Sequence, residues 1–138
     1  MYEYKCEVTR VVDGDTCDCI LDLGFSIMHK CRVRLYGIDT PESRTRDLDE
    51  KARGKLASKF LEDSINNGKE IILKSELKDS KGKYGRVLGS IIIDGLDINK
   101  AMVANNLAVK YFGQSKADVE AEHMVNRDIL VAEGAYEP

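Results

Sequence analysis

An arginine and two carboxylates lie close together in the segment 32–42, which reads Arg-Val-Arg-Leu-Tyr-Gly-Ile-Asp-Thr-Pro-Glu. Its first half alternates apolar and polar residues, as a half-buried strand does. Arg34 would stand on that strand, and Asp39 and Glu42 would follow it in a turn stiffened by Pro41. A guanidinium beside two fixed carboxylates can bind a phosphate next to a metal ion. A surface strand with a polar turn explains the same residues about as well.

Two more predicted turns carry residues that a packed core does not need. They hold Asp13, Gly14 and Asp15 in one case and Lys83, Tyr84 and Arg86 in the other. If Asp15 met Asp39, their carboxylates and the backbone carbonyl of Thr40 would offer the hard oxygen ligands that suit calcium or magnesium. Asp-Gly is also a common hairpin pair, and taken alone both turn aspartates are better explained as turn formers.

The remaining candidates fit phosphate chemistry, and each has a structural alternative. Arg34 and Arg86 each offer a planar fork to phosphate oxygens, or form surface ion pairs. Glu42 is placed to accept a proton from water, or is a solvated loop carboxylate. Tyr84 would contact a phosphate or a base, or cover the barrel mouth. Phe112 would stack on a base, or pack in the core.

Composition indicates one ordinary folded domain over residues 1–138. Hydrophobic residues make up 43% and charged residues 33% of the 138 residues, which is usual for a globular chain. No apolar run reaches the roughly 20 residues of a membrane helix, so we expect no membrane partner. The N-terminus has no apolar signal region, which predicts a cytoplasmic protein if Met1 is the native start.

Charge is unevenly placed along a chain whose net charge is −3. Such a mildly acidic balance is unusual for a nucleic-acid partner. Basic residues nevertheless gather around the segment 32–42 and again over 74–86, whereas acidic residues gather near the C-terminus. A local basic patch can bind a polyanion with weak long-range attraction.

All four cysteines, Cys6, Cys17, Cys19 and Cys31, fall in the first third of the chain. Their spacing lacks the Cys-x2-Cys pairs of a zinc site, and only His29 and His123 could add ligands. A disulfide is a second alternative. Reduced thiols that pack as small hydrophobic residues explain them best.

The order of predicted elements indicates an α+β, sheet-rich fold. Strands are expected at 2–12, 16–23, 25–36, 69–76 and 85–94, and helices at 49–66, 98–106 and 116–132. The first long helix would bury the side that carries Ala52, Leu56, Phe60 and Ile65. Five strands with a helix between the third and fourth predict an OB-fold, a five-stranded Greek-key barrel, here with three helices. Simple up-and-down counting separates the turn at Asp15 from the end of the third strand, so barrel curvature would have to bring Asp15 to Asp39.

Three blocks together resemble the staphylococcal nuclease (thermonuclease-like) family. They are Val-Val-Asp-Gly-Asp-Thr at 11–16, Arg-Leu-Tyr-Gly-Ile-Asp-Thr-Pro-Glu at 34–42 and Lys-Tyr-Gly-Arg-Val-Leu-Gly at 83–89. Their order and spacing fit the family, and the resemblance covers nearly the whole chain.

The resemblance implies an OB-fold nuclease that uses Ca²⁺ to hydrolyse DNA and RNA. It implies Asp15, Asp39 and the Thr40 carbonyl as calcium ligands, Glu42 as the general base, and Arg34 and Arg86 at the scissile phosphate. It further implies that Lys83 and Tyr84 touch a terminal phosphate. The expected substrate is single-stranded or loosely paired DNA, with RNA as a further candidate, cleaved to leave 3′-phosphates by a monomer.

The sequence departs from the family pattern in the base pocket. Where relatives often carry two tyrosines, it has Phe112 and Gln114, so we expect stacking at Phe112 without a hydroxyl group. The alternative function is a catalytically silent OB-fold module that binds nucleic acid or protein. Silent modules usually lose the carboxylates or the arginines, and this chain keeps them all, which favours the nuclease.

Overall fold

The computed structural model describes residues 2–76 and 87–138. Its first three strands form where buried and more exposed residues alternate along the sequence. These strands are β1 (Glu3–Asp13), β2 (Thr16–Asp22) and β3 (Met28–Leu35). In β2 every second residue is buried, so Cys17 and Leu21 face the core. Both neighbouring pairs are antiparallel, as the predicted meander requires.

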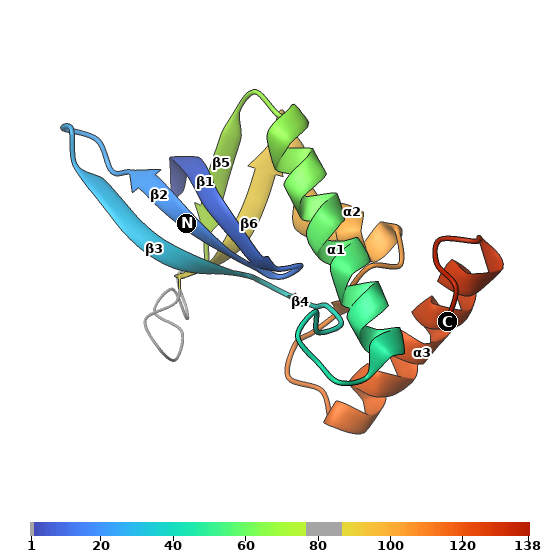
Figure 1. Cartoon of the computed structure of the whole chain (residues 1–138). Helices are drawn as coiled ribbons and strands as arrows, with labels where there is room; N and C mark the ends of the chain where they lie inside the picture. Colours follow the sequence, from blue (N-terminus) through green and yellow to red (C-terminus); the bar gives the residue numbers. More distant parts are fainter. Residues whose placement is uncertain (1, 77–86) are drawn as a thin grey trace.

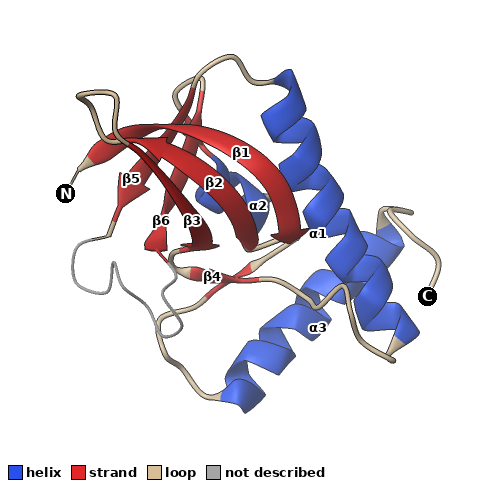
Figure 2. Ribbon diagram, turned by 60° about the vertical axis from the view of Figure 1, so that its left-hand side comes forward, coloured by secondary structure: helices blue, strands red, loops and turns tan. Residues whose placement is uncertain are grey.

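The sheet closes because β3 also pairs in parallel with β6 (Val87–Ile93), through Val33 and Val87. Between them, β5 (Ile71–Ser75) pairs with β1 on one side and with β6 on the other, and the short β7 (Leu96–Asp97) pairs with β6. Over the described residues, β1, β2, β3, β5 and β6 thus form a closed five-stranded barrel of mixed strand direction (Figure 2). The predicted OB-fold barrel of the α+β class is confirmed.

Three helices complete the described part of the chain: α1 (Leu48–Asn67), α2 (Ile98–Ala104) and α3 (Lys116–Ala132). Each follows a residue whose side-chain oxygen accepts a backbone N–H of the first turn, which stabilises helix starts. Figure 1 shows α1 running along the barrel and α3 beyond the end of it where β4 lies. No described helix is both long and apolar enough to span a bilayer.

The buried face of α1 differs from the predicted one. The buried residues are Arg53, Gly54, Ala57 and Leu61, whereas Ala52, Leu56, Phe60 and Ile65 are only half-buried. Small residues face inward because the helix touches the backbone of two loops. A Cβ on Gly54 would lie 2.5 Å from the carbonyl of Glu42, and one on Gly14 would lie 2.6 Å from the Cβ of Ala57.

Three strands of the described residues escaped prediction because each has only two residues. They are β7, β4 (Ile38–Asp39) and β8 (Val109–Lys110). The last two pair antiparallel, with Asp39 opposite Val109. A two-residue strand shows no alternation. This small ladder, visible below the barrel in Figure 2, ties the end of β3 to the segment that leads into α3.

Element ends shift where the backbone turns left-handed. The third strand begins at Met28 instead of Phe25, because Phe25 and Ser26 have φ of 55° and 63° and belong to the hairpin turn. Likewise α2 ends before Asn106, whose φ is 61°. The predicted start of the fifth strand at Gly85 lies outside the described residues.

All four cysteines are free thiols. Cys17 and Cys19 are buried, with their sulfur atoms 3.5 Å apart. A hydrogen bond with Cys19, together with burial, raises the pKa of the Cys6 thiol. The cysteines are therefore free thiols that pack as small side chains, as predicted.

Asp49, in the first turn of α1, anchors the end of the chain. Its carboxylate accepts hydrogen bonds from Arg53 (3.2 Å), Arg127 (3.1 Å) and the Tyr136 hydroxyl (2.7 Å). Loss of solvent raises the pKa of Asp49, but the Tyr136 hydrogen bond and the two arginine charges outweigh it, and the pKa lies below its ordinary value. The ionised carboxylate therefore fixes α3 and the C-terminal residues to the start of α1.

We expect Asp49→Asn to lower the free energy of unfolding at pH 7 by about 1–3 kcal/mol, because charged hydrogen bonds are removed. Since folding lowers this pKa, the contribution is complete above the unfolded value near 4 and disappears as the pH falls through the folded value. Urea unfolding at pH 7, 5 and 3.5 should therefore show parent and variant converging in acid. Asp63→Asn is the exposed control, and a difference that stays constant with pH would contradict the assignment.

Candidate active site at the end of the barrel

The turn after β1 and the end of β3 lie at the same end of the barrel. Thr16 pairs with Arg34, and the Leu35 N–H donates to the Asp15 carbonyl at 2.8 Å. The expectation from strand counting was wrong, because the first and third strands of a meander run in the same direction and finish together. No special curvature is needed to bring Asp15 to Arg34.

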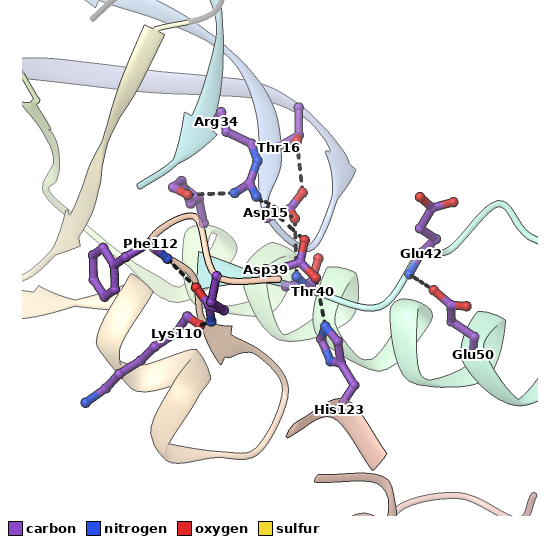
Figure 3. A network of polar contacts seen from close by, with 12 residues as sticks. Asp15, Thr16, Arg34, Asp39, Thr40, Glu42, Glu50, Lys110, Phe112 and His123 are labelled. Carbon is purple, nitrogen blue, oxygen red and sulfur yellow. Dashed lines mark hydrogen bonds and ion pairs between the residues drawn. The ribbon is translucent and has the colours of Figure 1, made fainter. Parts of the chain in front are cut away.

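Asp15, Arg34, Asp39 and Thr40 form one polar cluster (Figure 3). The Thr40 N–H donates to Oδ2 of Asp15 at 3.3 Å. Nη2 of Arg34 lies 3.5 Å from Asp15 Oδ2 and 3.8 Å from Asp39 Oδ1. One guanidinium thus faces two carboxylates. The side chains of Asp15 and Arg34 are largely removed from solvent, with 14% and 16% of their surface exposed.

The end of β3 sets the direction of the Arg34 side chain. Its Nη1 donates to the backbone carbonyl of Leu35 at 2.7 Å, which folds the guanidinium toward the strand end. The same side chain lines a cavity of about 400 Å³, called the first cavity here, together with Leu35, Leu88, Tyr111 and Phe112. An anion in the first cavity would therefore meet a guanidinium that is already held in place.

His123 of α3 joins this cluster, a role that the sequence alone did not indicate. Its Nε2 lies 2.8 Å from Asp39 Oδ2, and the side chain is only 12% exposed. Its Nδ1 is buried without a hydrogen-bond partner among the described residues. The ring therefore has one polar contact within the described part of the chain, which is with Asp39. The two residues are 84 positions apart, so no local spacing could have indicated the pair.

Glu42 lies farther along the loop that follows Asp39. Its N–H donates to Oε2 of Glu50 at 3.1 Å, and Gly54 lets α1 touch its backbone. The side chain is exposed, and Figure 3 shows its carboxylate pointing away from Asp15 and Asp39. In this structure Glu42 is held through its backbone while its carboxylate lies outside the polar cluster.

Phe112 stands at the rim of the first cavity with 69% of its surface exposed. Its ring meets that of Tyr36 edge-on, at a centroid distance of 6.1 Å. Gly37, with φ of 77°, lies under the ring, and a Cβ there would be 3.2 Å from it. Gln114 accepts the Phe112 N–H at 2.7 Å and donates to the Lys110 carbonyl. Gln114 therefore closes the turn that presents Phe112.

Three predicted site residues, Lys83, Tyr84 and Arg86, lie outside the described residues. The structure thus brings Asp15, Arg34, Asp39 and Thr40 together, with Phe112 at the cavity that Arg34 lines and Glu42 apart on the same loop.

The donor chemistry of the cluster fits a hard divalent cation. Two carboxylates, one from the β1–β2 turn and one from β4, approach one guanidinium nitrogen, so a second positive charge would be stabilised there. Within the part of the chain that the structure describes, no group of three or more His, Cys, Asp or Glu side chains is arranged to hold a metal ion. Asp15 and Asp39 could thus supply a partial shell that backbone oxygen and water complete.

Comparisons with known proteins identify relatives of this chain. Among similar proteins, endonuclease YhcR of Bacillus subtilis is 37% identical over 118 residues, 80% of this chain and 9% of the relative. Endonuclease YncB of the same species is 30% identical, over 79% and 53%. Protein ParB of Escherichia coli is 34% identical, over 86% and 64%. The chain thus spans less than two thirds of each of these relatives.

The family model described as staphylococcal nuclease homologue matches residues 32–131, which include Arg34, Asp39, Phe112 and His123. That range begins within β3, includes β5 and β6 of the barrel, and runs nearly to the end of α3. The match and the arrangement of the barrel end together place the molecule among its relatives: this chain belongs to the staphylococcal nuclease homologue family.

Proposed function

We propose that this chain is a calcium-dependent nuclease that hydrolyses phosphodiester bonds of single-stranded or loosely paired DNA, and of RNA as a second substrate class. The observation that carries the proposal is the convergence of Asp15, Arg34 and Asp39 beside the open first cavity. Membership of the family and two relatives named endonuclease support it.

Asp15, Asp39 and the backbone carbonyl of Thr40 would hold the calcium ion. Bound there, calcium would neutralise charge on the phosphate during displacement. Arg34 would donate to oxygens of the same phosphate, where negative charge grows in the transition state. Arg86, which precedes β6 in the sequence, would do the same.

Glu42 would accept a proton from the attacking water. The water oxygen would form a bond to phosphorus as the P–O5′ bond breaks, and the leaving 5′ oxygen would take a proton from solvent water, so the product would end in a 3′-phosphate. Because the Glu42 carboxylate is exposed and points away from Asp39, this role requires the side chain to change rotamer when substrate binds. Lys83 and Tyr84 would hold a terminal phosphate, and Phe112 would stack on a base.

His123 would act as a positioning residue. Its ring contacts one oxygen of Asp39 at 2.8 Å, which would leave the other oxygen, near Arg34, free to bind the calcium ion. Partners of this kind orient metal ligands, and their removal typically costs ten- to a hundredfold in metal affinity or activity.

Purified protein should degrade single-stranded DNA when calcium is present and stop when a chelator is added in excess, because without the metal ion the two carboxylates face only one guanidinium and would repel the phosphate. The measurement compares single-stranded DNA, duplex DNA and RNA across calcium, magnesium and manganese. Equal cleavage under chelation would exclude the metal assignment. Binding of DNA without cleavage under every ion would favour a silent binding module.

Glu42→Gln and Arg86→Ala should each lower the turnover rate at least about a hundredfold, as expected for a general base and a charge contact in the transition state. Steady-state cleavage of a labelled oligonucleotide measures the rate, and circular dichroism checks folding. Glu62→Gln, an exposed change on α1, is the matched control. A folded Glu42→Gln protein with near-normal turnover would remove Glu42 from the mechanism.

His123→Ala should raise the calcium concentration for half-maximal cleavage by about ten- to a hundredfold. At saturating calcium the turnover rate should change far less, because His123 touches the ligand and not the phosphate. Calorimetric titration of calcium without substrate provides the second readout. His123→Gln, which keeps a donor, should recover part of the affinity, and Glu122→Ala on the same helix is the control. An unchanged calcium midpoint in a folded His123→Ala protein would refute the positioning role.

A further inference from the structure

A second cavity, of about 570 Å³, shares the Tyr36 and Phe112 side chains with the first. It lies between α2 and the β4–β8 ladder, and its walls include Val103 and Ala104 of α2. Its volume falls in the range of small-molecule sites. The mechanism proposed above does not use it.

The two cavities share an aromatic wall. Tyr36, Gly37 and Phe112 line both, and the two rings are 37% and 69% exposed. Because the rings meet at 66°, they form a ridge instead of a flat floor. A ligand with several planar rings that enters the first cavity can therefore extend across these two side chains into the second cavity.

The rim of the second cavity is positively charged. Lys100 of α2 and Lys110 of β8 both line it and are exposed. Asp97 is the one acid among its described lining residues, and its carboxylate accepts the Lys100 N–H as the cap of α2. Aromatic faces beside lysines match the alternation of base and phosphate along a single strand.

We propose that the second cavity is a base subsite for the nucleotide adjacent to the one held at Arg34, with Lys100 and Lys110 near the connecting phosphates. The inference rests on the proposed nuclease function and extends it. It implies that the protein binds at least two successive nucleotides of an unpaired strand, since bases paired in a duplex are not free to occupy separate cavities.

The test fills the second cavity without touching the first. Ala104 is an exposed helix residue at the wall, so Ala104→Trp places an indole in the space. In a Glu42→Gln background, which blocks cleavage, calorimetry with calcium compares thymidine oligomers of one and three nucleotides. The matched control is Ala132→Trp, an exposed change in the last turn of α3.

We expect the trinucleotide to bind the background protein about ten- to a hundredfold more tightly than the mononucleotide, the range that one stacked base provides. Ala104→Trp should remove most of that gain and leave mononucleotide affinity unchanged, whereas Ala132→Trp should keep the gain. A folded Ala104→Trp protein with the full gain would overturn the proposal. The proposal would also be overturned if Ala104→Trp lowered the affinity for the mononucleotide and the trinucleotide equally, because both oligomers would then be bound at the same single site.

The lysines give an independent readout. Replacing Lys100 and Lys110 by methionine should reduce the slope of log Kd against log salt for the trinucleotide by about 0.7 for each phosphate that the protein no longer neutralises, whereas Lys59→Met should not. An unchanged slope would overturn the role of the lysines.

Two other results are distinguishable. If the unmodified chain cleaves no nucleic acid and the background protein binds neither oligomer, the proposed function fails and this inference with it. If the chain cleaves single-stranded DNA but the trinucleotide binds no more tightly than the mononucleotide, only the second subsite fails. Sedimentation that reveals a dimer broken by Ala104→Trp would assign the cavity to a second copy of the chain and overturn the proposal.

Discussion

The carboxylate of Asp15 joins the loops on which the site depends. One oxygen accepts the Thr16 hydroxyl and the other the Thr40 N–H, while the carbonyl of the same residue accepts the N–H of Leu35. A single residue thus connects the β1–β2 turn, the end of β3 and the end of β4. Removing this charge from water is costly, and Arg34 compensates for part of that cost. The same arrangement leaves a place where a cation is favourable.

Small residues set the distances around this cluster. At Gly54 the helix α1 touches the backbone of Glu42, and at Gly37 the backbone passes beneath the ring of Phe112. Larger side chains at either position would push the loop away from its support. The absence of a side chain at these two positions therefore shapes the site as much as the surrounding charges do. Because α1 packs through Gly54 and not through a large apolar residue, hydrophobic periodicity alone misplaced its buried face.

Strong local patterns made much of the fold predictable. Alternation in β1 to β3 and the long helical segment at 48–67 indicate the barrel and α1, and three motifs in register point to Asp15, Arg34 and Asp39. The ladder of β4 and β8 was missed because two residues carry no period. His123 was missed because its partner is remote in sequence. The direction of the Glu42 carboxylate depends on rotamer choice, which residue type does not determine.

The histidine that contacts Asp39 belongs to a helix whose far end is tied to α1 by Arg127 and Tyr136 through Asp49. The barrel therefore does not contain the whole candidate site, because His123 comes from a segment that is synthesised after every barrel strand. A protease cut between β8 and α3 would leave the barrel strands intact, yet it would remove the covalent link between the barrel and His123. Such a clipped molecule would keep its sheet, while the residues around Asp39 would become less ordered.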